Sequence, residues 1–118
     1  MRTAFINTLT ELARNNKDIF LLTGDVGFSV LEKFEREFPD RFFDVGVAEQ
    51  NMIGIAAGLA LSGKIIFVYS IIPFVTMRCF EHTRNDLCMQ NLNVTIVGMG
   101  TGLDYGFAGP THHAIEDI

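Results

Sequence analysis

The sequence alternates between short apolar segments and segments with helical periodicity, and this alternation constrains the fold more than any other feature. The apolar segments have the length of strands and end in glycine or polar residues. The strand-like segments are residues 18–27, 41–47, 64–70 and 93–100, and the helical segments are residues 2–16, 30–38, 49–61 and 76–89. Strands that are separated by helices pair in parallel through right-handed crossovers. The pattern therefore predicts an α/β fold in which a parallel sheet lies between two helical layers.

Composition narrows the class of protein. The chain has 118 residues, of which 48% are hydrophobic and 19% charged. This length and composition suffice for one hydrophobic core and argue against intrinsic disorder. The net charge is −5 and the nine Lys and Arg residues are scattered, which argues against nucleic-acid binding. No segment has the uniform apolar length of a membrane span. Cys79 and Cys88 point to opposite sides of one predicted helix, so we expect no disulfide and a cytoplasmic, reduced protein.

The last ten residues, GPTHHAIEDI, look like a loop that leads into the first turns of a helix. The sequence then stops without a helix cap or a closing strand. We therefore expect residues 1–118 to form one domain that is incomplete at its C-terminus. A truncated protein and a gene product completed by a second polypeptide would each explain this ending.

Several polar and aromatic residues fall in the loops that follow the predicted strands, where parallel sheets bind their ligands. They are Asp25, Ser29, Glu49, Phe74, His112 and His113. Each also has an ordinary structural role. Glu49 would stabilise a helix N-terminus by about 0.3 to 1 kcal/mol, Asp25 suits a turn and Phe74 suits a core. The two histidines suggest proton transfer or hydrogen bonding to a ligand, whereas no metal-ligand spacing is present.

Together, several segments resemble the pyrimidine-binding domain of transketolase-type thiamine diphosphate enzymes, a group that includes deoxyxylulose-phosphate synthases. The segments are DVGVAEQNMIGIAAGLALSG at residues 44–63, VYS at 68–70, MRCFEHTRNDL at 77–87 and GPTHHAIED at 109–117. The most specific element is GVAEQNM followed about 60 residues later by GPTHH. The resemblance covers nearly the whole chain and is closest to the stand-alone C-terminal halves of split transketolases. It implies a thiamine diphosphate-binding fold of the pyrimidine-domain type.

The resemblance also assigns residues to the cofactor. Glu49 takes the place of the glutamate that hydrogen-bonds the ring nitrogen N1' of the cofactor's aminopyrimidine. Apolar surroundings disfavour the charged form of a carboxyl group, so Glu49 would share a proton with the pyrimidine and trigger acid/base chemistry through it. An aromatic ring stacks on the pyrimidine in this family. The usual STF reads SII here, which makes Phe74 the candidate for stacking, and Asp25 is assigned to the same cofactor site.

Other positions are assigned to the substrate. Arg2 and Ser29 match an arginine and a serine that contact the sugar phosphate in transketolases. His112 matches a histidine that lines the substrate channel, where it would also serve in catalysis, and His113 stands beside it where many relatives have Gln. The family usually has an acidic residue where this chain has Ala108, which leaves the donor and acceptor sugars open.

The resemblance implies half of an active site. No segment resembles the GDG...N sequence that holds magnesium and diphosphate, so a partner domain or subunit would hold the diphosphate and Mg²⁺, in a homodimer or a heterotetramer. The expected activity is transfer of a two-carbon ketol unit between a ketose and an aldose, with sugar phosphates as substrates and no activity of the chain alone. The alternatives are a component of a deoxyxylulose-phosphate synthase-like or ketoacid-decarboxylating enzyme, and a non-catalytic dimerisation module of the same fold.

Overall fold

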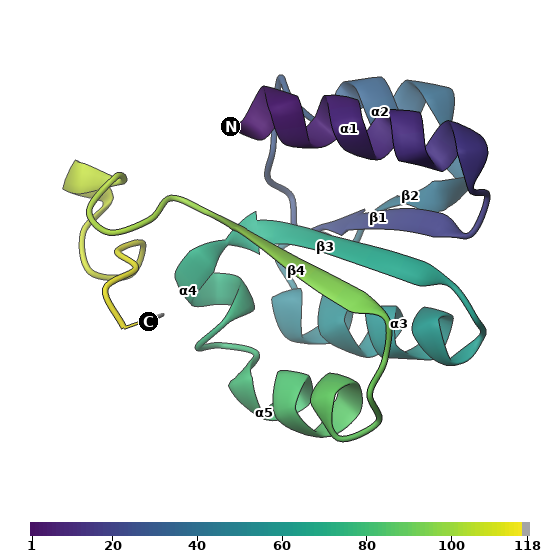
Figure 1. The fold of residues 1–118 in the computed structure, drawn as a ribbon. Coiled ribbons are helices and arrows are strands. Elements are labelled where there is room, and N and C mark those ends of the chain that lie inside the picture. The colour runs from purple at the N-terminus through teal and green to yellow at the C-terminus, as the bar shows by residue number, and fades with distance from the viewer. Residues whose placement is uncertain (117–118) are drawn as a thin grey trace.

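The fold is built on a four-stranded parallel sheet, seen in a computed structural model that describes residues 1–116 (Figure 1). The strands are β1 Ile19–Thr23, β2 Phe42–Asp44, β3 Ile65–Ile71 and β4 Val94–Met99. Their order in the sheet is β2-β1-β3-β4, and all three neighbouring pairs are parallel. The predicted parallel α/β sheet is therefore confirmed, with strands that lie inside the predicted segments except at Ile71, where β3 extends one residue beyond its segment.

Helices cover both faces of the sheet, as the predicted three-layer arrangement requires (Figure 1). The helices are α1 Arg2–Asn15, α2 Glu32–Glu37, α3 Glu49–Leu61, α4 Ile72–Val75 and α5 Phe80–His82, with a π-helical segment Thr83–Cys88 and single 3₁₀ turns at Pro39–Arg41 and Gly106–Ala108. Helices α1 and α2 lie on one face, and α3, α4 and α5 lie on the other. Among the described residues no helix is both long and apolar enough to cross a membrane.

Two cores form because successive side chains of a strand point to opposite faces of the sheet. Leu22 and Val68 pack against α3, whereas Leu21 and Tyr69 pack against α1 and α2. Strands that are buried on both faces read as continuous apolar runs, which is why they were visible in the sequence.

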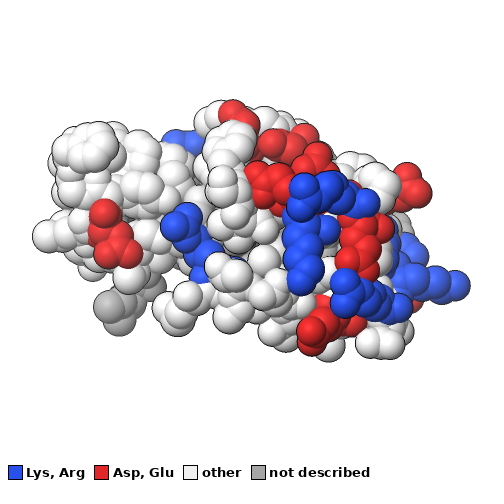
Figure 2. All heavy atoms as spheres, turned by 90° about the horizontal axis from the view of Figure 1, so that it is seen from above, with Lys and Arg blue, Asp and Glu red and all other residues white. Residues whose placement is uncertain are grey.

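Charged side chains of both signs intermingle over the α1 and α2 layer (Figure 2). The Arg14 guanidinium holds Glu37 with two contacts of 2.5 and 2.8 Å, which joins α1 to α2. Lys33 adds a second link, because its Nζ lies 2.7 Å from Oδ1 of Asn7. On this face the charges therefore form local pairs rather than a basic patch.

The segment after β3 differs from the predicted helix over residues 76–89. Helix α4 begins at Ile72, directly after β3, because Pro73 is preorganised for the first turn of a helix. Turns over residues 76–79 then interrupt the helical path before α5 and the π-helical segment. The prediction of one continuous helix was therefore wrong.

The end of the chain also differs from the prediction. Ala114 pairs with Gly102 in an isolated antiparallel bridge, with hydrogen bonds of 2.9 and 3.0 Å in the two directions. These bonds commit the backbone to an extended form, so the expected first helical turns are absent from residues 114–116. Residues 117–118 of that prediction lie outside the described residues.

Candidate functional site

Glu49 is buried at the carboxyl edge of the sheet. It begins α3, as predicted, and only 1% of its surface is exposed. The α3 N-cap residue, Ala48, offers no side-chain cap, and Glu49 places a negative charge in the first turn, near the positive end of the helix dipole. The hydroxyl of Ser70, at the end of β3, donates to Oε1 over 3.2 Å. The carboxylate is thus held between a helix N-terminus and a strand end.

Gly24, the first residue after β1, makes room for this carboxylate. A Cβ atom at this position would lie 3.3 Å from Oε1 of Glu49, closer than most such contacts. The absence of a side chain therefore lets the backbone at the end of β1 pack closely against the Glu49 carboxylate.

Arg78 supplies a cation that the sequence analysis did not predict. Its Nη1 lies 2.6 Å from Oε2 of Glu49, and its guanidinium carbon lies 4.2 Å from the ring centroid of Phe74. The side chain of Arg78 is 41% exposed, so the ion pair joins a buried anion to a cation at the surface. The surroundings of Glu49 are consequently less apolar than the sequence indicates. The one available signal was an arginine at the start of the MRCFEHTRNDL segment.

Cys79 lies beside this ion pair and is fully buried. Its Sγ donates to the carbonyl of Phe74 over 3.2 Å. Burial raises the pKa of the Cys79 thiol to about 11, the negative charge of Glu49 adds to the rise, and the Arg78 cation opposes it. A thiol of this kind stays protonated and unreactive near neutral pH.

His112 lies against Phe74, which brings two predicted site residues together. Their ring centroids are 4.9 Å apart in an edge-to-face arrangement. Nδ1 of His112 lies 2.9 Å from the hydroxyl of Thr111. We call Glu49, Ser70, Phe74, Arg78 and His112 the Glu49 cluster. His113 has a local contact instead: its Nε2 lies 3.0 Å from the carbonyl of Gly106, within the same loop.

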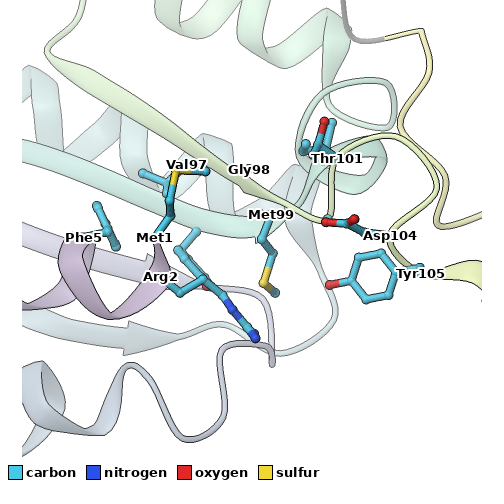
Figure 3. Close-up of a pocket in the computed structure, with 12 residues that line it drawn as sticks. Met1, Arg2, Phe5, Val97, Gly98, Met99, Thr101, Asp104 and Tyr105 are labelled. Atoms are coloured by element: carbon cyan, nitrogen blue, oxygen red, sulfur yellow. The ribbon is translucent and has the colours of Figure 1, made fainter.

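Arg2 lines a neighbouring cavity of about 600 Å³ (Figure 3). It comes from the first turn of α1, and Asp104 and Tyr105 come from the loop after β4. We call this space the Arg2 cavity. The ring of Tyr105 also lies 5.4 Å from that of His112, so the Arg2 cavity adjoins the Glu49 cluster.

Tyr69 lies at the wall of the Arg2 cavity with its hydroxyl buried and without a hydrogen-bond partner among the described residues. Burial raises the pKa of Tyr69, and the nearby charge of Arg2 works in the opposite direction. Burial likewise raises the pKa of Tyr105. Both phenols are therefore hydrogen-bonding groups, not charges, near neutral pH.

Asp25 and Ser29 lie in the exposed loop after β1, and neither lines the Arg2 cavity. Both have positive φ angles, 58° and 62°. The backbone N–H of Asp25 donates to Asp44 over 2.9 Å, and that of Ser29 donates to Glu32 over 2.6 Å. The structure thus brings Glu49, Phe74 and His112 together, places Arg2 beside them, and leaves Asp25 and Ser29 outside. The functional roles of all these residues stay predictions.

The fold and the site define a class: a parallel α/β domain that buries one carboxylate among loops at the carboxyl ends of its strands, where such folds bind ligands. Residues 1–118 match the family model described as "Transketolase, pyrimidine binding domain". The chain therefore belongs to the transketolase pyrimidine-binding domain family, as its resemblance indicated.

The chain is also similar to three individual proteins, two by sequence and one by sequence and structure. It is 45% identical to one of the subunits of the apulose-4-phosphate transketolase of Phocaeicola vulgatus, over 99% of this chain and 38% of the relative. It is 39% identical to 1-deoxy-D-xylulose-5-phosphate synthase 1 of Geobacter sulfurreducens, over 97% of this chain and 18% of the relative. A solved structure titled "Split gene transketolase, inactive beta4 tetramer" is 41% identical, with a TM-score of 0.84 over 98% of this chain and 37% of that chain. The chain thus spans less than two fifths of each of these proteins.

Proposed function

We propose that this chain supplies the pyrimidine-binding half of a transketolase active site. The complete enzyme would transfer a two-carbon ketol unit between a ketose and an aldose, using thiamine diphosphate. The observation that carries the proposal is the buried Glu49 carboxylate beside the Phe74 ring, in a chain that matches the family over its whole length. Residues 1–118 would form part of one such domain.

The chemistry of the Glu49 cluster suits an aminopyrimidine. A buried carboxylate accepts a hydrogen bond from a protonated ring nitrogen, and an aromatic face next to it favours a flat heteroaromatic ring. Gly24 leaves the space near Oε1 free of a side chain. When bound, thiamine diphosphate would supply the electron sink that ketol transfer requires. Glu49 would orient the ring and hold or release the proton at its nitrogen.

Neighbouring residues suit a polar sugar substrate. Because Nδ1 of His112 is engaged with Thr111, its Nε2 is the nitrogen available to a substrate hydroxyl. Arg2 offers a permanent cation to a phosphate group at the adjoining Arg2 cavity. The relative named for apulose-4-phosphate supports a sugar phosphate as substrate. Ala108, in the 3₁₀ turn after β4, offers no acid for reading a substrate hydroxyl.

A partner would complete this half-site. The split-gene transketolase structure is titled as an inactive β4 tetramer, which supports the view that a chain of this kind needs a second, different polypeptide. We infer that the partner carries the diphosphate-binding domain with its Mg²⁺, in a homodimer or heterotetramer that serves carbohydrate metabolism. Both described cysteines are free, which fits the reducing cytoplasm.

The same site would serve the main alternative, a deoxyxylulose-phosphate synthase-like enzyme, which the 39% identity to one such synthase supports. The higher identity to a separate transketolase subunit favours ketol transfer. A non-catalytic dimerisation module is a weaker alternative, because such a module has no use for a buried, ion-paired Glu49.

The test is a Glu49→Gln variant of the full-length chain, assembled with its diphosphate-domain subunit. The substitution keeps the size of the side chain but removes its acid, so we expect ketol transfer to fall by at least about 100-fold. Thiamine diphosphate affinity, measured by calorimetric titration, should also fall. The control is Glu81→Gln, which changes a carboxylate that is 66% exposed. Unchanged affinity and activity in the Glu49→Gln variant would refute the proposed role.

A further inference from the structure

The Arg78 side chain makes two contacts of different kinds, one with an aromatic ring and one with a carboxylate. Its planar guanidinium lies over the ring of Phe74, with 4.2 Å from the guanidinium carbon to the ring centroid. The same group donates to Oε2 of Glu49 over 2.6 Å. A flat, cationic, hydrogen-bonding group therefore covers one face of Phe74 and occupies the buried carboxylate at the same time.

A pyrimidine ring bound at this site would need the same two partners. It would stack on an aromatic face and present a protonated nitrogen to the Glu49 carboxylate. We propose that Arg78 is a latch that fills the pyrimidine position and must swing out before the cofactor binds. The inference rests on the proposed function, because it takes Glu49 and Phe74 as the pyrimidine contacts.

The local structure allows the Arg78 side chain to move while its backbone stays in place. The carbonyl of Arg78 accepts a hydrogen bond from Nε2 of Gln50 over 3.1 Å, and its N–H donates to the carbonyl of Pro73 over 3.2 Å. These bonds anchor the turn between α4 and α5. The side chain is 41% exposed, so rotation about its own bonds can carry the guanidinium into solvent.

The latch explains how a buried carboxylate is tolerated before the cofactor arrives. An uncompensated charge that is 1% exposed would be strongly unfavourable, and the Arg78 cation compensates it. The latch also sets a condition on the ligand. Any molecule that displaces the guanidinium must replace its hydrogen bond to Glu49 and its stacking on Phe74, which a protonatable, flat ring does and an aliphatic group does not.

The consequence is a lower apparent affinity in the wild type. When only a fraction of molecules is open, the apparent dissociation constant rises by the inverse of that fraction. We would test this with the full-length chain assembled with its diphosphate-domain subunit, titrating thiamine diphosphate in the presence of Mg²⁺. An Arg78→Met variant, which keeps the length but loses the charge and the planar group, should bind about three- to tenfold more tightly. The matched control is Arg84→Met, because Arg84 is exposed and its side chain donates a hydrogen bond to its neighbour Asn85, away from Glu49 and Phe74.

Binding kinetics give a second readout that does not depend on activity. If opening of the latch precedes binding, the observed rate for the wild type should level off as thiamine diphosphate concentration rises. In the Arg78→Met variant it should rise linearly over the same range. An Arg78→Lys variant, which keeps the charge but loses the planar fork, should have intermediate affinity, and circular dichroism would establish that each variant folds.

Three outcomes would overturn the latch. Weaker or equal binding by a folded Arg78→Met variant would make Arg78 a support for the cofactor rather than an obstacle. If that variant does not fold, linear wild-type kinetics would overturn the latch, whereas kinetics that level off would support it. Failure of the assembled wild type to bind thiamine diphosphate would overturn the proposed function and the latch together, whereas wild-type binding without the expected difference at Arg78 overturns the latch alone.

Discussion

At the scale of single residues, the Glu49 carboxylate is stabilised by three different contacts. The N-terminus of α3 offers its dipole, Ser70 donates a hydroxyl hydrogen, and Arg78 provides a full charge. Each contact comes from a different segment of the chain. The position of the carboxylate and the compensation of its charge therefore depend on three segments of the chain.

The burial of Cys79, beside Glu49, should make the free energy of unfolding depend on pH. Its thiol pKa is raised from 9.0 to about 11, mainly by burial. Between these two values the unfolded chain has lost the thiol proton while the folded chain retains it, so the free energy of unfolding falls as pH rises. We expect a loss of up to about 2–3 kcal/mol between pH 9 and 11, measured by urea denaturation.

The matched variants are Cys79→Ala and Cys88→Ala. Cys88 is exposed, so its replacement should leave the pH dependence of unfolding unchanged. Replacement of Cys79 should flatten it, although the raised pKa of Tyr69 preserves part of the slope at the alkaline end. An equal slope in the two variants would show that the Cys79 thiol does not titrate as its burial requires.

At the scale of elements, the glycines in and after α3 have two different roles: two lie on its exposed side, and one ends the helix. Gly54 and Gly58 lie on its exposed side, where an added Cβ would meet nothing within 4 Å. Gly63 follows the helix with a φ of 86°, and its N–H and that of Lys64 donate to the carbonyls of Ala60 and Leu59 in a Schellman-type end. The first two glycines leave a surface open, and the third ends the helix.

Alanine substitutions should separate these roles. Gly58→Ala should raise the free energy of unfolding of the isolated chain by about 0.5–1 kcal/mol, because alanine favours a helix interior. Gly63→Ala should lower it by about 1 kcal/mol or more, because the left-handed backbone then strains a side chain. If the exposed side of α3 packs against a partner, Gly58→Ala should also weaken assembly, measured by sedimentation. Tighter assembly would place the partner elsewhere.

The element scale also shows what the sequence could predict. Residues 49–61 were predicted as a helix and form α3 with the same limits, because a glutamate at its start and a glycine after its end are strong local signals. The break at residues 76–79 was missed, since apolar periodicity continues across it. The role of Arg78 was missed because it depends on this break. Its contact with Glu49 spans 29 residues and depends on where that break turns the chain.

At the scale of the whole molecule, several large apolar side chains are exposed in the loops at the carboxyl edge of the sheet. Phe28, Val47, Leu103 and Phe107 are each more than 60% exposed, and they come from loops that follow β1, β2 and β4. Exposed apolar side chains that gather at one edge are typical of an interaction surface. The carboxyl edge, where Glu49 also lies, therefore carries side chains of the kind found at interaction surfaces, which local sequence patterns alone do not reveal.

This edge leads to a prediction for assembly. A Phe28→Ser and Val47→Ser double variant removes apolar area that is already exposed in the isolated chain, so its free energy of unfolding should change by less than about 0.5 kcal/mol. If this edge contacts the proposed diphosphate-domain subunit, assembly should weaken at least about tenfold, measured by sedimentation velocity, because the contact loses two apolar side chains.

Leu12→Ser is the control for this double variant. Leu12 is 51% exposed, but it lies near the end of α1, away from the loops at the carboxyl edge. Its replacement should leave assembly unchanged. Equal weakening by the control would mean that α1 also contributes to the interface, and intact assembly of the double variant would mean that the partner approaches the Glu49 cluster without covering this edge.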